Sequence, residues 1–162
     1  MTQEQKKTLL KWRARYKRAQ LAHSYTAISY GRYSMALGVL LIILTTASCV
    51  LIFAKNVQPD WLSPVVGISA ALFAYLQTFL QLSEKADAQR AVARRYGALK
   101  KQIEFIIDFQ LNDANLDIKV DDLRKKEDEI ATEAPHALSH RWKEAKKETQ
   151  TENDEVSMRK RT

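Results

Sequence analysis

Amide, hydroxyl and small side chains recur along one face of an apolar stretch near the middle of the chain. If residues 61–83 form a helix, this face spans about 80° at 100° per residue. It carries Ser63, Gly67, Ala70, Ala74, Gln77 and Gln81, with Thr78 beside the two glutamines. Small residues let helices approach closely, and buried amides or hydroxyls hydrogen-bond between them. The same polar groups could instead line a hydrated path through an oligomer, so packing and pore lining both remain open.

The other residues with chemical potential do not form a recognisable catalytic or metal-binding pattern. His136 and His140 are four residues apart, but Pro135 precedes them and a third ligand is missing, which disfavours metal ligation. Acidic runs such as 121–122 and 127–129 alternate with lysine and arginine, as on a solvated helix surface. Cys49 is the single cysteine, which excludes an internal disulfide. We therefore expect no enzymatic activity, no cofactor and no bound metal.

The formal net charge of +7 is concentrated before the first apolar stretch, because residues from Glu84 onward balance 17 basic against 17 acidic side chains. Basic residues beside a membrane favour anionic lipid, and this explains them better than nucleic-acid binding, which we do not expect. The candidates for contact with lipid head groups or with a ligand are Lys11, Arg15, Arg18, Arg94 and Arg95.

Two stretches without any charged residue, 33–54 and 61–83, define the fold class. At about 1.5 Å per residue each is long enough to cross the roughly 30 Å hydrocarbon core of a bilayer. The connection at 55–60 is short, so the pattern predicts a transmembrane helical hairpin. A buried helix pair in a soluble bundle is the alternative, but the remaining charge-rich residues could not easily cover it. Lysine and arginine on both flanks place the two termini in the cytoplasm.

The flanking segments predict helices that extend the hairpin as a cytoplasmic stalk. Residues 1–32 form an amphipathic helix whose buried face carries Leu9, Trp12, Tyr16, Ala19, His23 and Tyr30. The second span should continue without a break to about residue 111, with a heptad-like seam at Gln89, Val92, Tyr96, Leu99, Ile103, Ile106 and Gln110. The two helices are expected to pack together, and the seam to offer a surface for homo-oligomerisation.

The rest of the cytoplasmic region, within 84–147, is predicted to be helical and interrupted by turns. A turn at 112–115 precedes a third helix with Val120, Leu123, Ile130 and Ala131 on one side, which Pro135 ends or kinks. Residues 136–147 could add one or two helical turns. The tail 148–162 has almost no apolar residues and is expected to be disordered.

Several short motifs around the end of the second span resemble the SLATT domain, a family of two-transmembrane effectors of bacterial conflict systems. They are Tyr75-Leu76-Gln77-Thr78-Phe79, Glu84-Lys85-Ala86, Arg95-Tyr96-Gly97-Ala98-Leu99, Ile103-Glu104 and the later Glu133-Ala134-Pro135. The resemblance covers roughly residues 5–145. The chain departs from it at Gln89-Arg90, where a histidine would be expected.

The resemblance implies an oligomeric effector in the bacterial inner membrane that opens or disrupts it and arrests or kills an infected cell. It further implies a trigger, either a nucleotide second messenger or the protein that senses or makes one. The residues alone leave two alternatives open. One is a non-conducting membrane anchor whose stalk recruits cytoplasmic partners, and the other, less favoured, is a phage-type holin.

Overall fold

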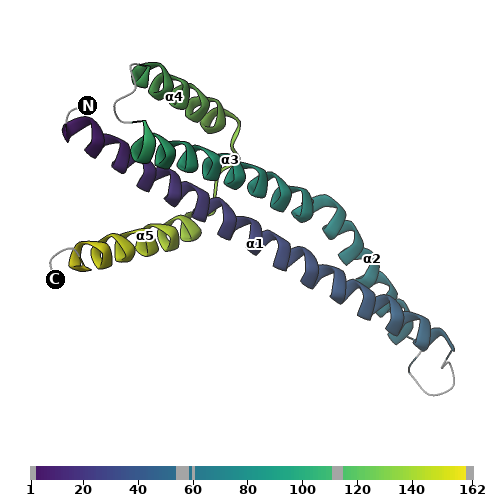
Figure 1. Ribbon diagram of the computed structural model, residues 1–162. Helices are drawn as coiled ribbons and strands as arrows, with labels where there is room; N and C mark the ends of the chain where they lie inside the picture. Colours follow the sequence, from purple (N-terminus) through teal and green to yellow (C-terminus); the bar gives the residue numbers. More distant parts are fainter. Residues whose placement is uncertain (1–2, 54–58, 60, 111–114, 160–162) are drawn as a thin grey trace. The chain divides into compact units, whose positions relative to one another are not determined.

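The structure is a computed structural model that describes residues 3–53, 59, 61–110 and 115–159, and these form five α-helices and no strand (Figure 1). The helices are α1 (Gln3–Phe53), α2 (Leu62–Leu80), α3 (Leu82–Phe109), α4 (Leu116–Glu133) and α5 (Ser139–Arg159). The predicted all-α class is confirmed. The predicted connection 55–60 and the turn 112–115 lie outside the described residues except for Pro59 and Asn115.

The chain divides into two compact units. The first unit comprises residues Met1–Ala27 and Asp87–Thr162, and the second comprises Ile28–Ala86. Helix α1 is continuous and contributes to both units. The predicted boundary between an N-terminal helix ending at residue 32 and a first span starting at 33 is therefore not marked by any break in the helix.

The first unit is built around the two apolar stripes that the sequence predicts. Its core contains Leu9, Tyr16 and Ala19 from α1 together with Val92, Tyr96, Leu99, Ile103 and Ile106 from α3. The rings of Tyr16 and Tyr96 lie 6.3 Å apart, which puts the two helices in direct contact. The predicted packing of these helices against each other is confirmed.

The expectation that the heptad-like seam offers a surface for homo-oligomerisation is wrong, because the seam packs within the chain. Every seam residue from Gln89 to Ile106 is buried in the first unit. Apolar contributions from α4, namely Leu116, Leu123 and Ile130, complete the same core. The seam is therefore not free to bind a second copy of the chain, and any homo-oligomer has to use another surface.

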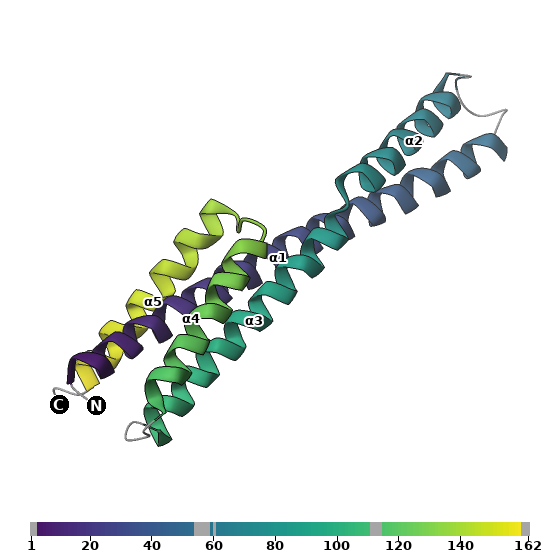
Figure 2. The same cartoon turned by 90° about the horizontal axis from the view of Figure 1, so that it is seen from above.

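Helix α4 lies beside α3 in both views, and its end is the one that the sequence predicts (Figures 1 and 2). Ala134 has an extended backbone (φ −69°, ψ 127°), as expected for a residue before proline. Leu123 and Ile130 are buried as predicted, and Val120 packs against the core. Ala131 is exposed, so its predicted place on the buried side is wrong.

Helix α5 corrects the prediction that the chain becomes disordered at Glu148. The helix runs past that position to Arg159. Ala145 and Thr149 are buried, and Tyr25 of α1 donates a hydrogen bond to the Glu148 carboxylate. The polar composition of this segment gives no apolar periodicity that would predict the contact, which includes the buried Ala145 and Thr149.

The second unit consists mainly of the C-terminal half of α1 and of α2, which lie side by side in both views (Figures 1 and 2). Large apolar side chains cover the outside of both helices; among them Met35, Ile68 and Phe79 are 74%, 62% and 84% exposed. Cys49 is exposed as well. By length and composition, the stretches Glu4–Phe53 and Leu62–Phe109 each include a segment able to cross a membrane, and at most 6% of either segment is buried.

Helices α2 and α3 are not one continuous helix, contrary to the expectation for residues 61–111. Gln81 separates them with a left-handed backbone (φ 46°, ψ 40°), and it is the one described non-glycine residue with positive φ. Such a conformation costs roughly 1–2 kcal/mol for a residue with a side chain. Neither proline nor glycine marks this position, so no local sequence signal predicts the break.

Candidate functional site

A cavity lies between α1 and α2 in the second unit, at the position where α2 ends, and its mostly apolar lining includes hydroxyl, amide and carboxylate side chains. Its volume is about 440 Å³. It is lined by Ser34, Leu37 and Leu41 of α1, by Ala74, Gln77 and Thr78 of α2, and by Gln81, Leu82, Ser83 and Glu84. This α1–α2 cavity brings together four of the seven residues predicted to line a pore or pack helices: Ala74, Gln77, Thr78 and Gln81.

Two of the residues that line this cavity carry oxygen acceptors with no hydrogen-bond donor among the described residues. Gln77 Oε1 is buried and has no hydrogen-bond partner among the described residues. Thr78 Oγ1 donates its hydrogen to the Ala74 carbonyl oxygen at 3.1 Å, so its lone pairs remain available. Leaving a buried acceptor unsatisfied costs about 1–3 kcal/mol, and such groups usually mark a site for water, an ion or function.

The remaining residues of the predicted face serve in packing. A Cβ atom added at Gly67 would lie 3.5 Å from the Ser48 hydroxyl oxygen of α1, so the two helices meet closely there. Ala70 is buried, while Ser63 is only partly buried near the start of α2. The face is therefore divided: its first half holds α2 against α1, and its second half lines the cavity. The packing role is seen along the first half, while lining of a hydrated path through an oligomer stays a prediction.

Three of the five predicted basic contact residues are engaged within the first unit. Arg15 forms an ion pair with Glu127 of α4, and Arg95 pairs with Glu133 at the end of the same helix. Arg18 donates to the Thr149 hydroxyl of α5 at 3.3 Å. Lys11 and Arg94 are exposed. Arg15, Arg18 and Arg95 therefore join helices to one another, while the side chains of Arg15 and Arg95 stay 54% and 42% exposed. Contact with lipid or a ligand stays a prediction for all five residues.

A buried polar network between α1 and α3 was not predicted. Gln89 is 2% exposed, and its Nε2 donates to the carbonyl oxygens of Pro135 (3.4 Å) and His136 (3.1 Å). This fixes the orientation of the amide, so Oε1 faces His23 Nδ1 at 2.6 Å and the hydrogen must be on Nδ1. The sequence signal was present, since a histidine and a glutamine occupy core positions of the two stripes.

Burial and hydrogen bonding shift several pKa values in this unit. Burial lowers the pKa of His23 below its ordinary value of 6.5, although the bond to Gln89 opposes the shift. Burial also raises the pKa of Tyr16, as does its hydrogen bond to Glu127. The hydrogen bond to Glu148 raises the pKa of Tyr25 to about 12. The imidazole is therefore neutral at pH 7, and the phenols of Tyr16 and Tyr25 act as hydrogen-bond donors.

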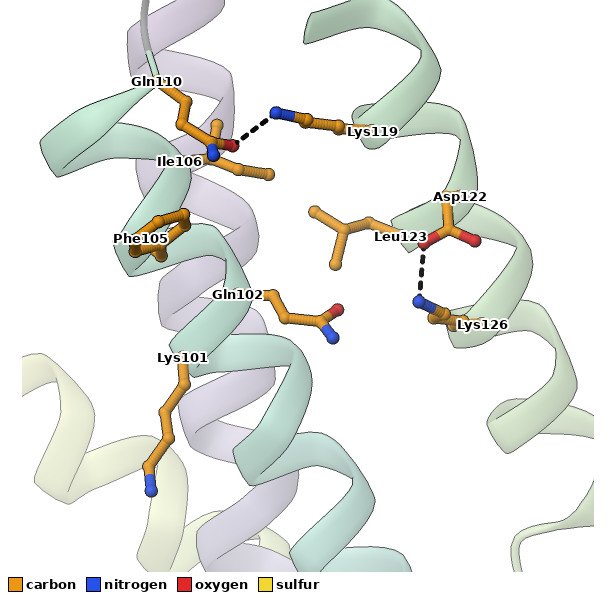
Figure 3. A pocket seen from close by; sticks show the side chains of 9 residues that line it. All are labelled: Lys101, Gln102, Phe105, Ile106, Gln110, Lys119, Asp122, Leu123 and Lys126. Atoms are coloured by element: carbon orange, nitrogen blue, oxygen red, sulfur yellow. Dashed lines mark hydrogen bonds and ion pairs between the residues drawn. The ribbon is translucent and has the colours of Figure 1, made fainter. Parts of the chain in front are cut away.

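Two further cavities lie in the first unit. A groove of about 320 Å³ runs between α3 and α4, with Ile106 and Leu123 facing each other across it and Gln102 directed toward α4 (Figure 3). Two of the lysines that line the groove bind neighbouring side chains: Lys119 donates to Gln110, and Lys126 pairs with Asp122. A second cavity of about 500 Å³ is lined by His23, Tyr96, Trp142 and Lys143 and by the α4–α5 connection.

In the part of the chain that the structure describes, no three histidine, cysteine or carboxylate side chains gather as metal ligands would. Comparison of the chain with protein-family models, with curated proteins and with solved structures finds no match. The interpretation of the site consequently depends on its own geometry: an apolar exterior, a cavity whose lining includes polar side chains with free acceptors, and a helical unit held by buried hydrogen bonds.

Proposed function

We propose that the chain is a membrane effector whose apolar segments, 33–53 in α1 and α2, insert as a transmembrane hairpin. Several copies then assemble and let ions cross through the polar face of α2. Both termini lie in the cytoplasm of a bacterial cell, and the outcome of assembly is growth arrest or death. The observation that carries the proposal is the contrast between the apolar exterior of these helices and the hydroxyl, amide and carboxylate side chains that line the cavity between them.

The apolar exterior of the two helices supports membrane insertion, because contact of these side chains with water is unfavourable. Exposed large apolar residues extend along both helices, whereas soluble monomers rarely expose contiguous apolar patches above a few hundred Å². A buried pair in a soluble bundle would be covered by other helices, but at most 6% of each apolar segment is buried. Helix α2 has 19 residues, which at about 1.5 Å per residue matches the roughly 30 Å hydrocarbon core.

The interior supports conduction after assembly. Polar residues within membrane helices are costly and usually face a partner helix or a water-filled cavity. Gln77, Thr78 and Gln81 line the α1–α2 cavity, and the Gln77 oxygen has no hydrogen-bond donor among the described residues. Two helices cannot enclose a pore, so the path requires several subunits.

The trigger follows from the resemblance to SLATT domains and is part of the same proposal. The resemblance implies a nucleotide second messenger, or a protein that senses or makes one, as the partner. A ligand shifts a conformational equilibrium only by binding one state better than the other. The cavity beside His23 and Tyr96 in the first unit is large enough for a small molecule.

The test is induced expression of the full chain in bacteria with a fluorescent reporter of membrane potential. Overproduction favours the assembled state by mass action even without the trigger. We expect the potential to collapse and growth to stop. Gln77→Leu should blunt the collapse at equal protein level, because it removes the free acceptor. Gln102→Leu, which changes an exposed amide of α3, is the matched control and should act like the wild type.

The other candidate functions predict different results. A non-conducting scaffold would leave the membrane potential unchanged at any expression level. A holin would cause abrupt lysis when a muralytic enzyme is supplied. Either result contradicts the proposed conduction.

A further inference from the structure

We infer that the α1–α2 cavity makes the path selective for cations over anions, with Glu84 as the residue that determines selectivity; this inference rests on the proposed function. The starting observation is charge. Glu84 is the single ionisable residue among those lining the cavity, whose other polar members are serine, threonine and glutamine. A carboxylate beside a low-dielectric cavity attracts counter-ions and raises their local concentration.

The neutral oxygens favour the same class of ion. Gln77 Oε1 has no donor among the described residues, and the Thr78 hydroxyl has already given its hydrogen to the Ala74 carbonyl. The Thr78 oxygen therefore keeps lone pairs for another donor or an ion, and the Gln77 oxygen lacks a donor although it is itself buried. Hard cations such as alkali and alkaline-earth ions prefer oxygen ligands of this kind.

Rings of acidic side chains favour cations in channels, and assembled copies of the chain would form such a ring. Each copy contributes one carboxylate at its cavity. The cavity volume of about 440 Å³ leaves room for an ion that keeps much of its water, since one water molecule takes about 30 Å³. Weak, hydrated binding is what conduction requires, because an ion must also leave.

An anion path is the opposing possibility. The N-terminus of α3 begins at Leu82, directly at the cavity, and helix N-termini attract anions. Glu84 lies in the first turn of α3 and offsets this partial positive charge. The Glu84 carboxylate thus decides the sign of the electrostatic potential in the cavity. Its removal should therefore have a larger effect on ion selectivity than on conductance.

The experiment measures reversal potentials of the full chain in planar bilayers under a KCl gradient. We expect the wild type to favour K⁺ over Cl⁻ by at least roughly fivefold, as a charged constriction does. Glu84→Gln should bring this ratio close to one while currents persist, and Glu84→Asp should retain the preference. Asp87→Asn is the matched control: it neutralises a carboxylate that pairs with Arg90 and does not line the cavity.

The outcomes distinguish the inference from the proposed function. Currents with no preference for K⁺ in the wild type, or an unchanged preference in Glu84→Gln, overturn the inference and leave conduction intact. An anion preference in the wild type also overturns it. The absence of any current from the wild-type chain overturns the proposed function and the inference together.

Discussion

The Nδ1–H group of His23 donates to Oε1 of Gln89 at 2.6 Å, joining α1 to α3 across 66 residues of sequence. The amide nitrogen of the same glutamine binds the two carbonyl oxygens at the α4–α5 connection. The imidazole ring of His23 also stacks on Tyr96, with ring centroids 5.7 Å apart. One buried amide of α3 thus satisfies polar groups from two other parts of the first unit, α1 and the α4–α5 connection.

Replacing this amide should destabilise the protein. Gln89→Leu leaves the His23 donor and the two carbonyl oxygens without their partner, and we expect a loss of about 1–3 kcal/mol in the free energy of unfolding. Thermal unfolding in detergent, followed by circular dichroism, measures it. Arg90→Leu is the control, since Arg90 makes only an exposed ion pair with Asp87 and should change stability by less than about 0.5 kcal/mol. Equal effects of the two substitutions would contradict the buried network.

Stability should fall as the pH drops below about 6.5, the ordinary pKa of histidine. Burial lowers the pKa of His23 in the folded state, so between 6.5 and that lower value the unfolded chain binds a proton that the folded chain does not. The slope for this one group is at most about 1.4 kcal/mol per pH unit, and stability is retained above 6.5.

The measurement is the unfolding midpoint between pH 7.5 and pH 5.0 for wild type and His23→Gln. The substitution should flatten the profile in this window, even if it lowers the midpoint at pH 7.5. His140→Gln changes an exposed histidine and should keep the wild-type profile. A profile that His23→Gln leaves unchanged would show that another group is responsible.

The left-handed backbone at Gln81 predicts that glycine at this position increases the stability of the protein. Glycine adopts this conformation without the steric cost that a side chain brings, so Gln81→Gly should raise stability by about 1 kcal/mol. Ala71→Gly, at an exposed position inside α2, should lower it by roughly 0.5–1 kcal/mol. Unfolding in detergent compares the two variants. If both lose stability alike, residue 81 is helical and the interruption between α2 and α3 is wrong.

Two threonines test whether α5 docks on the first unit. Thr149 and Thr132 each donate to the carbonyl oxygen four residues earlier, at 2.9 and 2.8 Å. Thr149 is buried and accepts a bond from Arg18, whereas Thr132 is exposed. Thr149→Ala should therefore cost about 1 kcal/mol and Thr132→Ala less than about 0.5 kcal/mol. A disordered segment from residue 148 onward would make Thr149→Ala neutral in the same thermal unfolding assay.

Helix faces were predictable because they repeat. Leu9 and Tyr16 lie seven residues apart in α1, Leu99 and Ile103 lie four apart in α3, and all four are buried as this helical spacing predicts. The two charge-free stretches predicted the apolar segments of α1 and α2, because a long run without charge is also visible in the sequence itself. Pro135 predicted the end of α4.

Features that depend on single tertiary contacts were not predictable. The break at Gln81 has no local signal, and the polar composition of α5 gives no apolar periodicity that would predict its contact with the rest of the first unit. The basic residues of α1 and α3 were expected to face lipid, because charge alone does not reveal the carboxylates of α4, such as Glu127, that lie opposite. Within the candidate site, the stripe on α2 was visible in the sequence, but its division between packing and a cavity depends on where α1 lies.

The exposed Cys49, the one thiol in the chain, supplies a native reporter of depth. Alkylation by a water-soluble maleimide needs a hydrated thiolate, so lipid contact would protect this side chain in intact vesicles and detergent would unmask it. Topology can thus be mapped on the unaltered protein, and any newly introduced cysteine requires only a single replacement of Cys49 beforehand.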